Sequence, residues 1–341
     1  MRWSWSALRN PGRRERERRY RVSLDTTPHR KIGLALSAGG AKGLAHVGVL
    51  QVFEENGIEI DAIAGCSMGS YVGALWACGY SGVDLEELAA EIQDRKKLWK
   101  LADPVIPPVS GLFYGLKAKR LLMKSIGEIR FEDLARRLLI VTFDLDTKER
   151  LVLREGRIAD AVHASCAMPG VIKPVMHGGH RCADGGVVDP VPISALKKFS
   201  DVDITVGVSV LPSLGEVERF AHAPPPLETE PPRPLRRLGA ALNRNVNLLA
   251  PGNVIDTLRL SVQAAQLRIA EQSCRRATFS IHPVFELPGH WHDYTNFRHY
   301  IDAGRAAAKA ALPKLQALLN SNTPLPNEGS PHPPLVGERV A

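Results

Sequence analysis

The sequence has few cysteines, and none of them forms a C-x-x-C pair. The five cysteines among the 341 residues are far apart and follow no regular spacing: Cys66, Cys78, Cys166, Cys182 and Cys274. An odd and scattered set argues against a disulfide framework and against a structural zinc site. We therefore expect no structural metal and a reducing compartment, with the cytoplasm fitting best.

The sequence also lacks long apolar runs. None approaches the ~18 residues that a membrane-spanning helix needs, and the first residues contain no uninterrupted apolar stretch of the kind found in secretory signals. Apolar residues make up 44% and charged residues 23% of the chain, which is typical of a globular protein with a substantial core. These features predict a cytoplasmic protein whose contact with a membrane, if any, is peripheral and at the inner face.

Positive charge dominates, with a formal net charge of +8 and a pI of about 9.3. Much of the excess lies in residues 1–30, which have no hydrophobic periodicity and are predicted to form a flexible basic arm. The arm is either a solvated segment or, with Trp3 and Trp5, an attachment to an anionic membrane. No nucleic-acid-binding motif accompanies this charge, so we expect no nucleic acid as a partner.

Strands and helices are predicted to alternate along much of the chain. Two short apolar strands, 31–36 and 60–64, are each followed by a glycine-rich turn and a helix, which is typical of a parallel sheet. Right-handed crossovers would place both turns at the same carboxyl edge of that sheet. Further expected elements are strands at 138–143, 150–153, 203–210 and 277–284, and helices at 41–56, 158–168, 253–272 and 296–319.

The chain is predicted to divide into five segments. The basic arm, residues 1–30, precedes a catalytic core at 31–212. Proline clusters then predict an exposed loop or linker over 213–250. Residues 251–319 are expected to complete the domain with helices and a strand, and the proline-rich residues 320–341 are expected to be a disordered tail. The sequence contains no internal repeat.

The stretch Gly65-Cys66-Ser67-Met68-Gly69 matches G-x-S-x-G, a sharp strand-to-helix turn that exposes a serine hydroxyl. Glycines are needed two residues before and after the serine because side chains there would collide. An apolar strand before the motif and a helix of small residues after it favour Ser67 as a nucleophile. The alternative is a glycine-rich turn with a serine that caps a helix.

A second glycine-rich turn, residues 37–43, joins the first strand to the first helix. It is a poor dinucleotide-binding motif, because Ala38 stands where the first glycine belongs and no acidic residue follows at the expected distance. It is also no Walker loop, since Lys42 is followed by Gly43. A loop that aims backbone N–H groups at an oxyanion explains its glycines and its place beside Ser67.

A nucleophilic serine needs a base, which in most serine hydrolases is a histidine. His46, His163, His177 and His180 lie in ordinary contexts and are better explained as surface or hydrogen-bonded histidines. Asp184 is a better candidate, because it stands on the glycine turn Asp184-Gly185-Gly186 and can approach another loop closely. D-G-G alone, however, is common and usually only a turn.

Together these three elements resemble the patatin-like phospholipase family, of the bacterial type, which uses a Ser-Asp dyad. Residues 164–175, from Ala164-Ser165-Cys166-Ala167-Met168-Pro169 onward, resemble that family's A-S-x-A-x-P segment. The resemblance covers residues 31–210. It implies an α/β fold with three α/β/α layers and a mainly parallel central sheet. It also implies a serine acyl hydrolase that cleaves phospholipids or other lipid esters, without a cofactor or metal, in lipid catabolism.

The resemblance assigns a role to each matching position. Ser67 would be the nucleophile and Asp184 its base, and the N–H groups of Gly39, Gly40 and Ala41 would bind the oxyanion. The remaining matching positions would support these motifs: Lys42, Gly43, Gly65, Gly69, Gly185 and Gly186. The one departure is Ala38, where many relatives have glycine. It is acceptable if position 38 does not need a positive φ.

Two other functions are compatible with parts of the pattern. A silent scaffold would keep the fold and bind partners, although each expected catalytic position holds a competent residue. A triad hydrolase, such as a thioesterase, would use a late histidine from His290, His292 or His299. The apolar Leu112, Phe113, Tyr114 and Leu116 are equally compatible with an acyl groove and with ordinary packing.

Overall fold

The computed structural model of the chain describes residues 30–93, 100–108, 110–221, 254–285, 293–321 and 339–340. The predicted basic arm, apart from residue 30, lies outside these residues. The same holds for most of the predicted linker and for most of the predicted tail. Arg339–Val340 form a two-residue strand, β9, beside β4.

The centre of the fold is one mixed sheet, in which the described residues form nine strands. Its middle is parallel and runs in the order β3, β2, β1, β7, β8. Antiparallel strands extend it beyond β3. The parallel strands are β1 (Ile32–Leu36), β2 (Ala62–Cys66), β3 (Arg137–Asp144), β7 (Ile204–Val208) and β8 (Phe279–Ile281), and the antiparallel ones are β4 (Arg150–Leu153), β5 (Val175–His177) and β6 (His180–Asp184).

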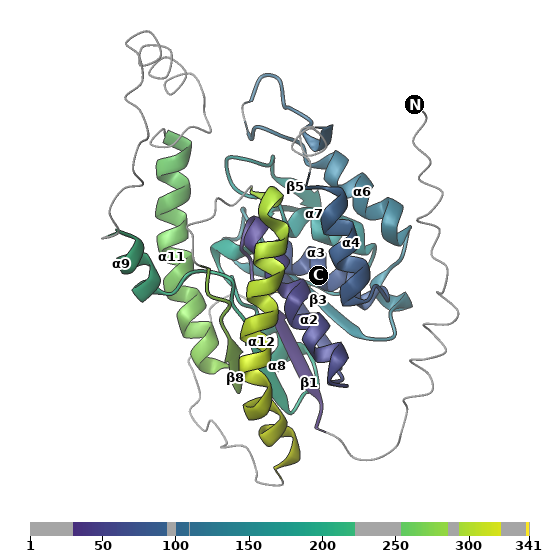
Figure 1. Cartoon of the computed structure of the whole chain (residues 1–341). Helices are drawn as coiled ribbons and strands as arrows, with labels where there is room; N and C mark the ends of the chain where they lie inside the picture. The colour runs from purple at the N-terminus through teal and green to yellow at the C-terminus, as the bar shows by residue number, and fades with distance from the viewer. Residues whose placement is uncertain are drawn as a thin grey trace.

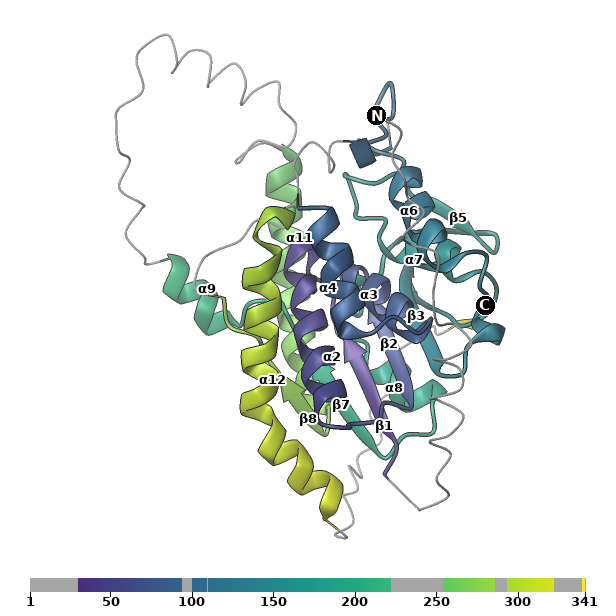
Figure 2. The same cartoon turned by 45° about the vertical axis from the view of Figure 1, so that its right-hand side comes forward.

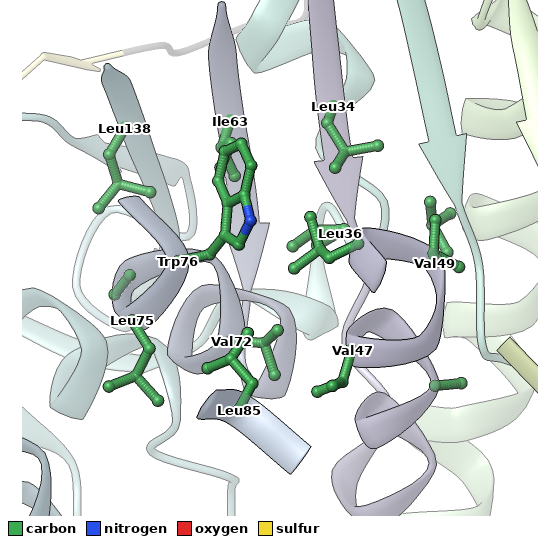
Figure 3. Close-up of a cluster of buried hydrophobic side chains, with 14 of the residues drawn as sticks. Leu34, Leu36, Val47, Val49, Ile63, Val72, Leu75, Trp76, Leu85 and Leu138 are labelled. Atoms are coloured by element: carbon green, nitrogen blue, oxygen red, sulfur yellow. The ribbon is translucent and has the colours of Figure 1, made fainter. Parts of the chain in front are cut away.

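Helices cover both faces of the sheet, which explains why β1 and β2 are buried along their whole length. Leu34 and Leu36 point to one face and join a core cluster with α2, α3 and α12 (Figure 3). Ala35 points to the other face and joins a second cluster with α8 and α11. The result is the three-layer α/β/α arrangement with a mainly parallel sheet that the sequence predicts (Figures 1 and 2).

Among the described residues, the helices α2, α3, α7, α11 and α12 lie close to predicted helices, whereas α4, α6, α8 and α9 lie where no helix was predicted. Their bounds are α2 (Ala45–Glu55), α3 (Met68–Ala77), α4 (Gly82–Glu91), α6 (Leu116–Ile126), α7 (Ile158–Ser165), α8 (Ile193–Phe199), α9 (Leu214–Ala221), α11 (Val254–Arg276) and α12 (Phe297–Asn320). The helix predicted over 158–168 ends three residues early. The chain tightens there, because the N–H groups of Ala167 and Met168 donate to the carbonyls of Ala164 and Cys166, at 3.2 and 2.8 Å. The Ala167 carbonyl accepts a hydrogen bond from the Asp184 N–H, at 2.8 Å.

Helix α9 corrects the predicted linker, whose first residues are helical. Ser213 and Glu216 form a reciprocal cap: the Ser213 N–H donates to the Glu216 carboxylate at 2.7 Å, and the Glu216 N–H donates to Ser213 Oγ at 3.2 Å. This is the S-x-x-E pattern of a capping box, and the prolines begin only at residue 224. The capping-box pattern in the sequence therefore indicates this helix. The loop predicted from the proline clusters begins too early in the chain.

Helices α2 and α12 lie against each other (Figures 1 and 2). Two glycines allow the contact. A Cβ on Gly48 would lie 2.0 Å from the Ile301 carbonyl oxygen, and a Cβ on Gly304 would lie 1.9 Å from the Ala45 carbonyl oxygen. Arg305 adds a hydrogen bond to Gln51 at 2.8 Å. The C-terminal helix is thus packed directly on the helix that follows the first glycine-rich turn.

Both glycine-rich turns leave the same edge of the sheet, as predicted. Strands β1 and β2 are parallel, with Leu36 opposite Gly65. One strand therefore ends at the turn 37–43 and the other at Ser67. The short helix η2 (Gly40–Leu44) leads from the first turn into α2.

Candidate active site

Ser67 occupies a strained turn between β2 and α3. Its φ of 52° and ψ of −121° lie outside the regions that side chains favour. The flanking glycines leave no room for a side chain: a Cβ on Gly65 would lie 2.5 Å from the Ser70 Cα, and one on Gly69 would lie 2.2 Å from the Leu36 carbonyl oxygen. This geometry is what the G-x-S-x-G spacing predicts for an exposed nucleophile.

The backbone of Ser67 is held by a buried serine that the sequence analysis gave no role. The Ser67 N–H donates to Ser165 Oγ at 2.9 Å, and Ser165 Oγ donates to the Val141 carbonyl at 2.6 Å. The Ser67 carbonyl accepts from Ser70 Oγ at 2.6 Å. Ser165 belongs to the A-S-x-A-x-P stretch, so its position was marked by the motif although its function was not.

Asp184 ends β6 and meets the Ser67 side chain directly. Ser67 Oγ donates to Asp184 Oδ2 at 2.6 Å, and the Gly186 N–H donates to Oδ1 at 2.8 Å. Burial raises the pKa of the Asp184 carboxyl to about 6, while the hydrogen bonds from Ser67 and Gly186 act in the opposite direction. The structure thus places a carboxyl of near-neutral pKa in hydrogen-bond contact with the serine hydroxyl.

Histidines take other positions in the described residues. His46 is buried with Nε2 2.9 Å from the Ser37 carbonyl oxygen, and burial lowers its pKa to about 4. His163 Nε2 contacts the Tyr114 carbonyl oxygen at 2.9 Å, and His180 Nδ1 contacts Asp144 at 2.8 Å. His299 is exposed on α12. His290 and His292, the other candidates for a triad, lie outside the described residues.

The first glycine-rich turn packs against the serine turn. A Cβ on Gly43 would lie 2.4 Å from the Met68 Cγ, so Met68 fills the space that a side chain would take. The N–H groups of Gly39, Gly40 and Ala41 have no hydrogen-bond acceptor among the described residues. They remain available to a ligand atom, which is the property that an oxyanion loop requires.

Ala38 fits this turn without strain. Among the described residues, only Ser67 and Lys148 combine a side chain with positive φ, so position 38 needs no glycine. The Ala38 N–H donates to the Pro190 carbonyl at 2.9 Å. This bond ties the first turn to the segment that follows Asp184-Gly185-Gly186.

The D-G-G turn is fixed by close packing and by a buried ion pair. A Cβ on Gly185 would lie 2.4 Å from the Val141 carbonyl oxygen. The Asp189 N–H donates to the Gly185 carbonyl at 2.9 Å, and Asp189 pairs with Arg150 at 2.5 Å. Burial raises the pKa of Asp189, and Arg150 opposes that rise. No local motif indicates this pair, because its partners are separated by 39 residues.

Side chains from the C-terminal part of the chain reach the site as well. The Nε2 atom of Gln266, in α11, lies 3.0 Å from the position that a Cβ atom on Gly186 would occupy. Lys42 is half-buried with Nζ 5.3 Å from the centre of the Phe285 ring. Burial lowers the pKa of Lys42, and the nearby Glu216 favours its charged form. These contacts join distant segments, so motif analysis could not find them.

A half-buried wall of Cys166, Tyr71 and Tyr294 lies beside the serine. Burial raises the pKa of the Cys166 thiol to about 12, opposed by hydrogen bonds with Ser70 and Ser67. Burial also raises the pKa of the Tyr71 and Tyr294 hydroxyls. Both side chains lie close enough to Cys166 to interact with it electrostatically. These three side chains form a largely apolar wall next to Ser67.

The predicted groove residues lie next to the segment 171–173. The N–H groups of Leu112 and Phe113 both donate to the Val171 carbonyl, at 3.0 and 2.9 Å. Leu112 and Phe113 are half-buried, whereas Tyr114 and Leu116 are exposed. Whether they hold an acyl chain or only pack stays a prediction. In the parts of the chain that the structure describes, there is no cluster of side chains suited to a metal ion, and no helix there is long and apolar enough to cross a membrane.

This chain is similar to a known protein family and to several known proteins. A family model described as patatin-like phospholipase matches residues 34–197. An uncharacterized NTE family protein of Mycobacterium tuberculosis (strain H37Rv) is 32% identical over 291 residues, which are 83% of this chain and 46% of that protein. The chain thus spans less than half the length of this relative.

Two further similarities are more partial. Lysophospholipase NTE1 of Yarrowia lipolytica is 32% identical over 167 residues, which are 49% of this chain and 12% of that protein. The crystal structure of VipD from Legionella pneumophila has a TM-score of 0.43 at 14% identity, over 83% of this chain and 67% of that chain.

Proposed function

The chain belongs to the patatin-like phospholipase family, and from that premise we propose that it hydrolyses lipid acyl esters with Ser67 as nucleophile and Asp184 as base. The observation that carries this proposal is the 2.6 Å hydrogen bond from Ser67 Oγ to Asp184 Oδ2. A nucleophile within hydrogen-bond reach of its base is the geometry that such catalysis needs.

Acylation begins when Ser67 Oγ attacks the ester carbonyl carbon and its proton passes to Asp184 Oδ2. The carbonyl oxygen becomes an oxyanion, which the free N–H groups of Gly39, Gly40 and Ala41 stabilise. When the tetrahedral intermediate collapses, the bond to the alcohol oxygen breaks. Asp184 returns the proton to that oxygen, so that an alcohol leaves and an acyl-serine remains.

Deacylation repeats the same steps with water. Asp184, ionised again, takes a proton from a water molecule that attacks the acyl carbon. The intermediate then collapses, Ser67 Oγ recovers the proton, and a free fatty acid leaves. All proton transfers pass through one carboxyl, so no cofactor or metal takes part.

The proposed substrates are phospholipids, lysophospholipids or other lipid esters. The name of the fungal relative, a lysophospholipase, supports this class, as does the largely apolar wall of Tyr71, Cys166 and Tyr294. Lys42 would add a cation near the oxyanion loop. We place the activity in lipid catabolism, in the cytoplasm or at the inner membrane face, with the basic residues 1–30 as one attachment to anionic lipid.

The catalytic unit is proposed to extend beyond the family match. It consists of residues 31–212 together with residues 251–319, since Gln266 and Phe285 both contact elements of the site. Residues 213–250 would connect these two parts, and only their first turns, in α9, lie among the described residues.

Two substitutions test the proposal. Ser67→Ala should abolish labelling by a fluorophosphonate and hydrolysis of short-chain esters. Asp184→Asn keeps the shape of the side chain but cannot accept the serine proton, so acylation should fall by several orders of magnitude with ester binding largely retained. The thermal melt shows whether each variant is folded.

Histidine variants serve as matched controls. His290→Ala, His292→Ala and His299→Ala should keep substantial activity, because a Ser-Asp dyad gives them no role in proton transfer. Loss of labelling in one of these variants would indicate a triad hydrolase instead. A wild-type protein that neither labels nor hydrolyses any ester would indicate a silent scaffold.

A further inference from the structure

The loop before α6, of which residues 103–108 and 110–115 are described, is a protrusion beside the candidate active site. The Val105 N–H donates to the Leu112 carbonyl at 2.9 Å, which closes the loop on itself. The Lys173 N–H donates to the Phe113 carbonyl at 2.8 Å, which ties the loop to the chain leading into β5. In Figures 1 and 2 this loop, α6 and β5 lie together at the end of the molecule where strand β1 terminates.

Four large apolar side chains are exposed on this protrusion and its neighbours. Ile106 is 84% exposed, Met176 63%, and Tyr114 and Leu116 39% each. Single exposed apolar residues are ordinary on protein surfaces, but several on segments that are bonded to one another provide an apolar surface for interaction. We call these four residues the apolar rim.

Basic side chains accompany the apolar rim. From residue 100 to residue 127 the chain has five basic residues, Lys100, Lys117, Lys119, Arg120 and Lys124, and a single acidic one, Asp103. The carboxylate oxygens of Asp103 accept hydrogen bonds from the N–H groups of Gly115 and Lys117, at 2.8 and 3.0 Å.

Three cations lie close to the rim and are exposed to solvent. Lys117 and Arg120 are exposed on α6. Lys173 Nζ lies 5.6 Å from the centre of the Tyr114 ring. Lys119 differs from these residues, because it pairs with Asp160 at 2.5 Å. The described surface around the rim therefore carries three exposed cations, Lys117, Arg120 and Lys173.

The loop that carries part of the rim is bonded to segments close to Ser67. It is bonded to Val171 and Lys173, only a few residues after Cys166, whose thiol contacts the Ser67 hydroxyl. His163, on the helix that carries Ser165, contacts the Tyr114 carbonyl oxygen at 2.9 Å. A surface that bound the rim would therefore lie close to Ser67.

We propose that the apolar rim and its basic residues form a docking surface for an anionic lipid bilayer, with the candidate active site facing that bilayer. Apolar side chains enter the interfacial region while Lys and Arg contact acidic headgroups, and each contribution strengthens the other. This proposal rests on the proposed function, since it gives a lipid hydrolase the route by which its substrate arrives. It assigns membrane contact to the described fold, independently of residues 1–30.

The test measures vesicle binding of the full chain, in a Ser67→Ala background so that hydrolysis cannot alter the vesicles. Cosedimentation is compared for phosphatidylcholine vesicles and for vesicles that also contain phosphatidylglycerol. The rim variants are Ile106→Ser with Met176→Ser, and separately Arg120→Gln. The matched controls are Val83→Ser, where the side chain is 62% exposed at the start of α4, and Lys309→Gln, where the lysine is exposed on α12.

Wild-type protein should prefer the anionic vesicles, and added salt should weaken that preference. The double rim variant should lose at least about tenfold in binding, since burial of even one large apolar side chain is worth that much. Arg120→Gln should lose about fivefold on anionic vesicles and little on neutral ones. The two controls should bind as wild type.

A local measurement separates the rim from the basic arm. On anionic vesicles, hydrogen–deuterium exchange should slow in residues 103–116 and 173–181 and stay unchanged in the second half of α12. Rim variants that bind like wild type, or protection confined to other segments, would overturn the proposal. Equal binding to neutral and to anionic vesicles would overturn the claim that the docking surface prefers anionic lipid.

The outcome does not depend on catalysis, because binding is measured with the nucleophile removed. Hydrolysis of a water-soluble ester by Ile106→Ser, Met176→Ser and Arg120→Gln, with Ser67 intact, should equal that of wild type. A chain that docks but hydrolyses no ester would contradict the proposed function and leave the docking surface standing.

Discussion

Among single residues, Asp184 has the property that most directly controls the proposed reaction. Its carboxyl must be ionised to accept the Ser67 proton, and burial raises its pKa to about 6. We therefore expect kcat/KM for a soluble ester to rise as the pH increases through about 6 and then to level off. A pH–rate profile of the free enzyme measures this directly. An acid limb near 4, the ordinary range of an aspartate, would contradict a raised pKa for the Asp184 carboxyl.

Ser165 is expected to position the nucleophile without touching the substrate. In Ser165→Ala the Ser67 N–H and the Val141 carbonyl both lose a buried partner, which costs about 1–3 kcal/mol of unfolding free energy. The strained turn at Ser67 also loses its anchor, so kcat should fall more than KM rises. Urea denaturation and steady-state kinetics measure the two effects.

A second buried serine provides the control for this prediction. Ser209 is similarly buried but contacts Cys274, away from the Ser67 turn. Ser209→Ala should lower stability with kcat almost unchanged. Equal kcat in the two variants would mean that Ser165 is only part of the core.

At the level of elements, the contact between α2 and α12 holds the first glycine-rich turn. Helix α12 touches both α2 and the short helix η2 that contains part of that turn. Gly304→Ala would bring a Cβ to within 1.9 Å of the Ala45 carbonyl oxygen, so the helices must move apart. We expect a loss of about 1–3 kcal/mol in unfolding free energy, or more, together with a lower kcat, as measured by denaturation and ester hydrolysis.

Gly215 gives a control for the added methyl group. It lies in α9, and a Cβ there would meet no atom within 4 Å. Gly215→Ala should therefore leave stability unchanged or raise it by up to about 1 kcal/mol, because alanine favours helix. If Gly304→Ala and Gly215→Ala had the same free energy of unfolding, the close contact between α2 and α12 would not restrict the side chain at position 304.

The elements that the sequence predicted well are those with a strong local signal. Strands β1 and β2 are apolar on every residue, and the glycines around Ser67 mark the turn between β2 and α3. Helix α9 was missed because proline clusters outweighed its capping box. Helix α7 ends three residues before its predicted end, and the Ala167 carbonyl beyond it accepts a hydrogen bond from Asp184, a contact that no local pattern contains. Local chemistry thus indicated the elements better than it indicated their ends.

The same distinction applies to the candidate site. Ser67, Asp184 and the glycine-rich turn lie in short motifs, so their residues could be named before their geometry was known. Ser165, Gln266 and Phe285 act through contacts across the fold, and nothing in their sequence neighbourhood shows which residue they will meet. The 2.6 Å hydrogen bond between Ser67 and Asp184 likewise depends on the pairing of β6 with β3.

At the scale of the whole molecule, side chains from the C-terminal third of the chain pack in the same hydrophobic core as the strand that leads into the first glycine-rich turn. Ile281, Phe285, Tyr300 and Ile301 are buried in the cluster that also contains Leu34 and Leu36. A chain that ends at residue 212 would expose that surface and the edge of β7. We expect it to lack a cooperative thermal transition by circular dichroism, whereas a chain of residues 30–321 should melt cooperatively and label at Ser67. Cooperative melting of the shorter chain would show that the motif region folds alone.

In the proposed reaction, the hydrogen bond between the Ser67 N–H and Ser165 would give the site a handedness. Because that N–H is occupied, the oxyanion would lie on the side of Gly39, Gly40 and Ala41. The leaving oxygen would lie near Asp184 to receive its proton, and the acyl chain would take the direction that remains. Ser67 would then attack one face of the planar carbonyl only. Mirror-image phosphonates, which carry the same four groups around phosphorus in opposite order, should therefore react with this serine at different rates.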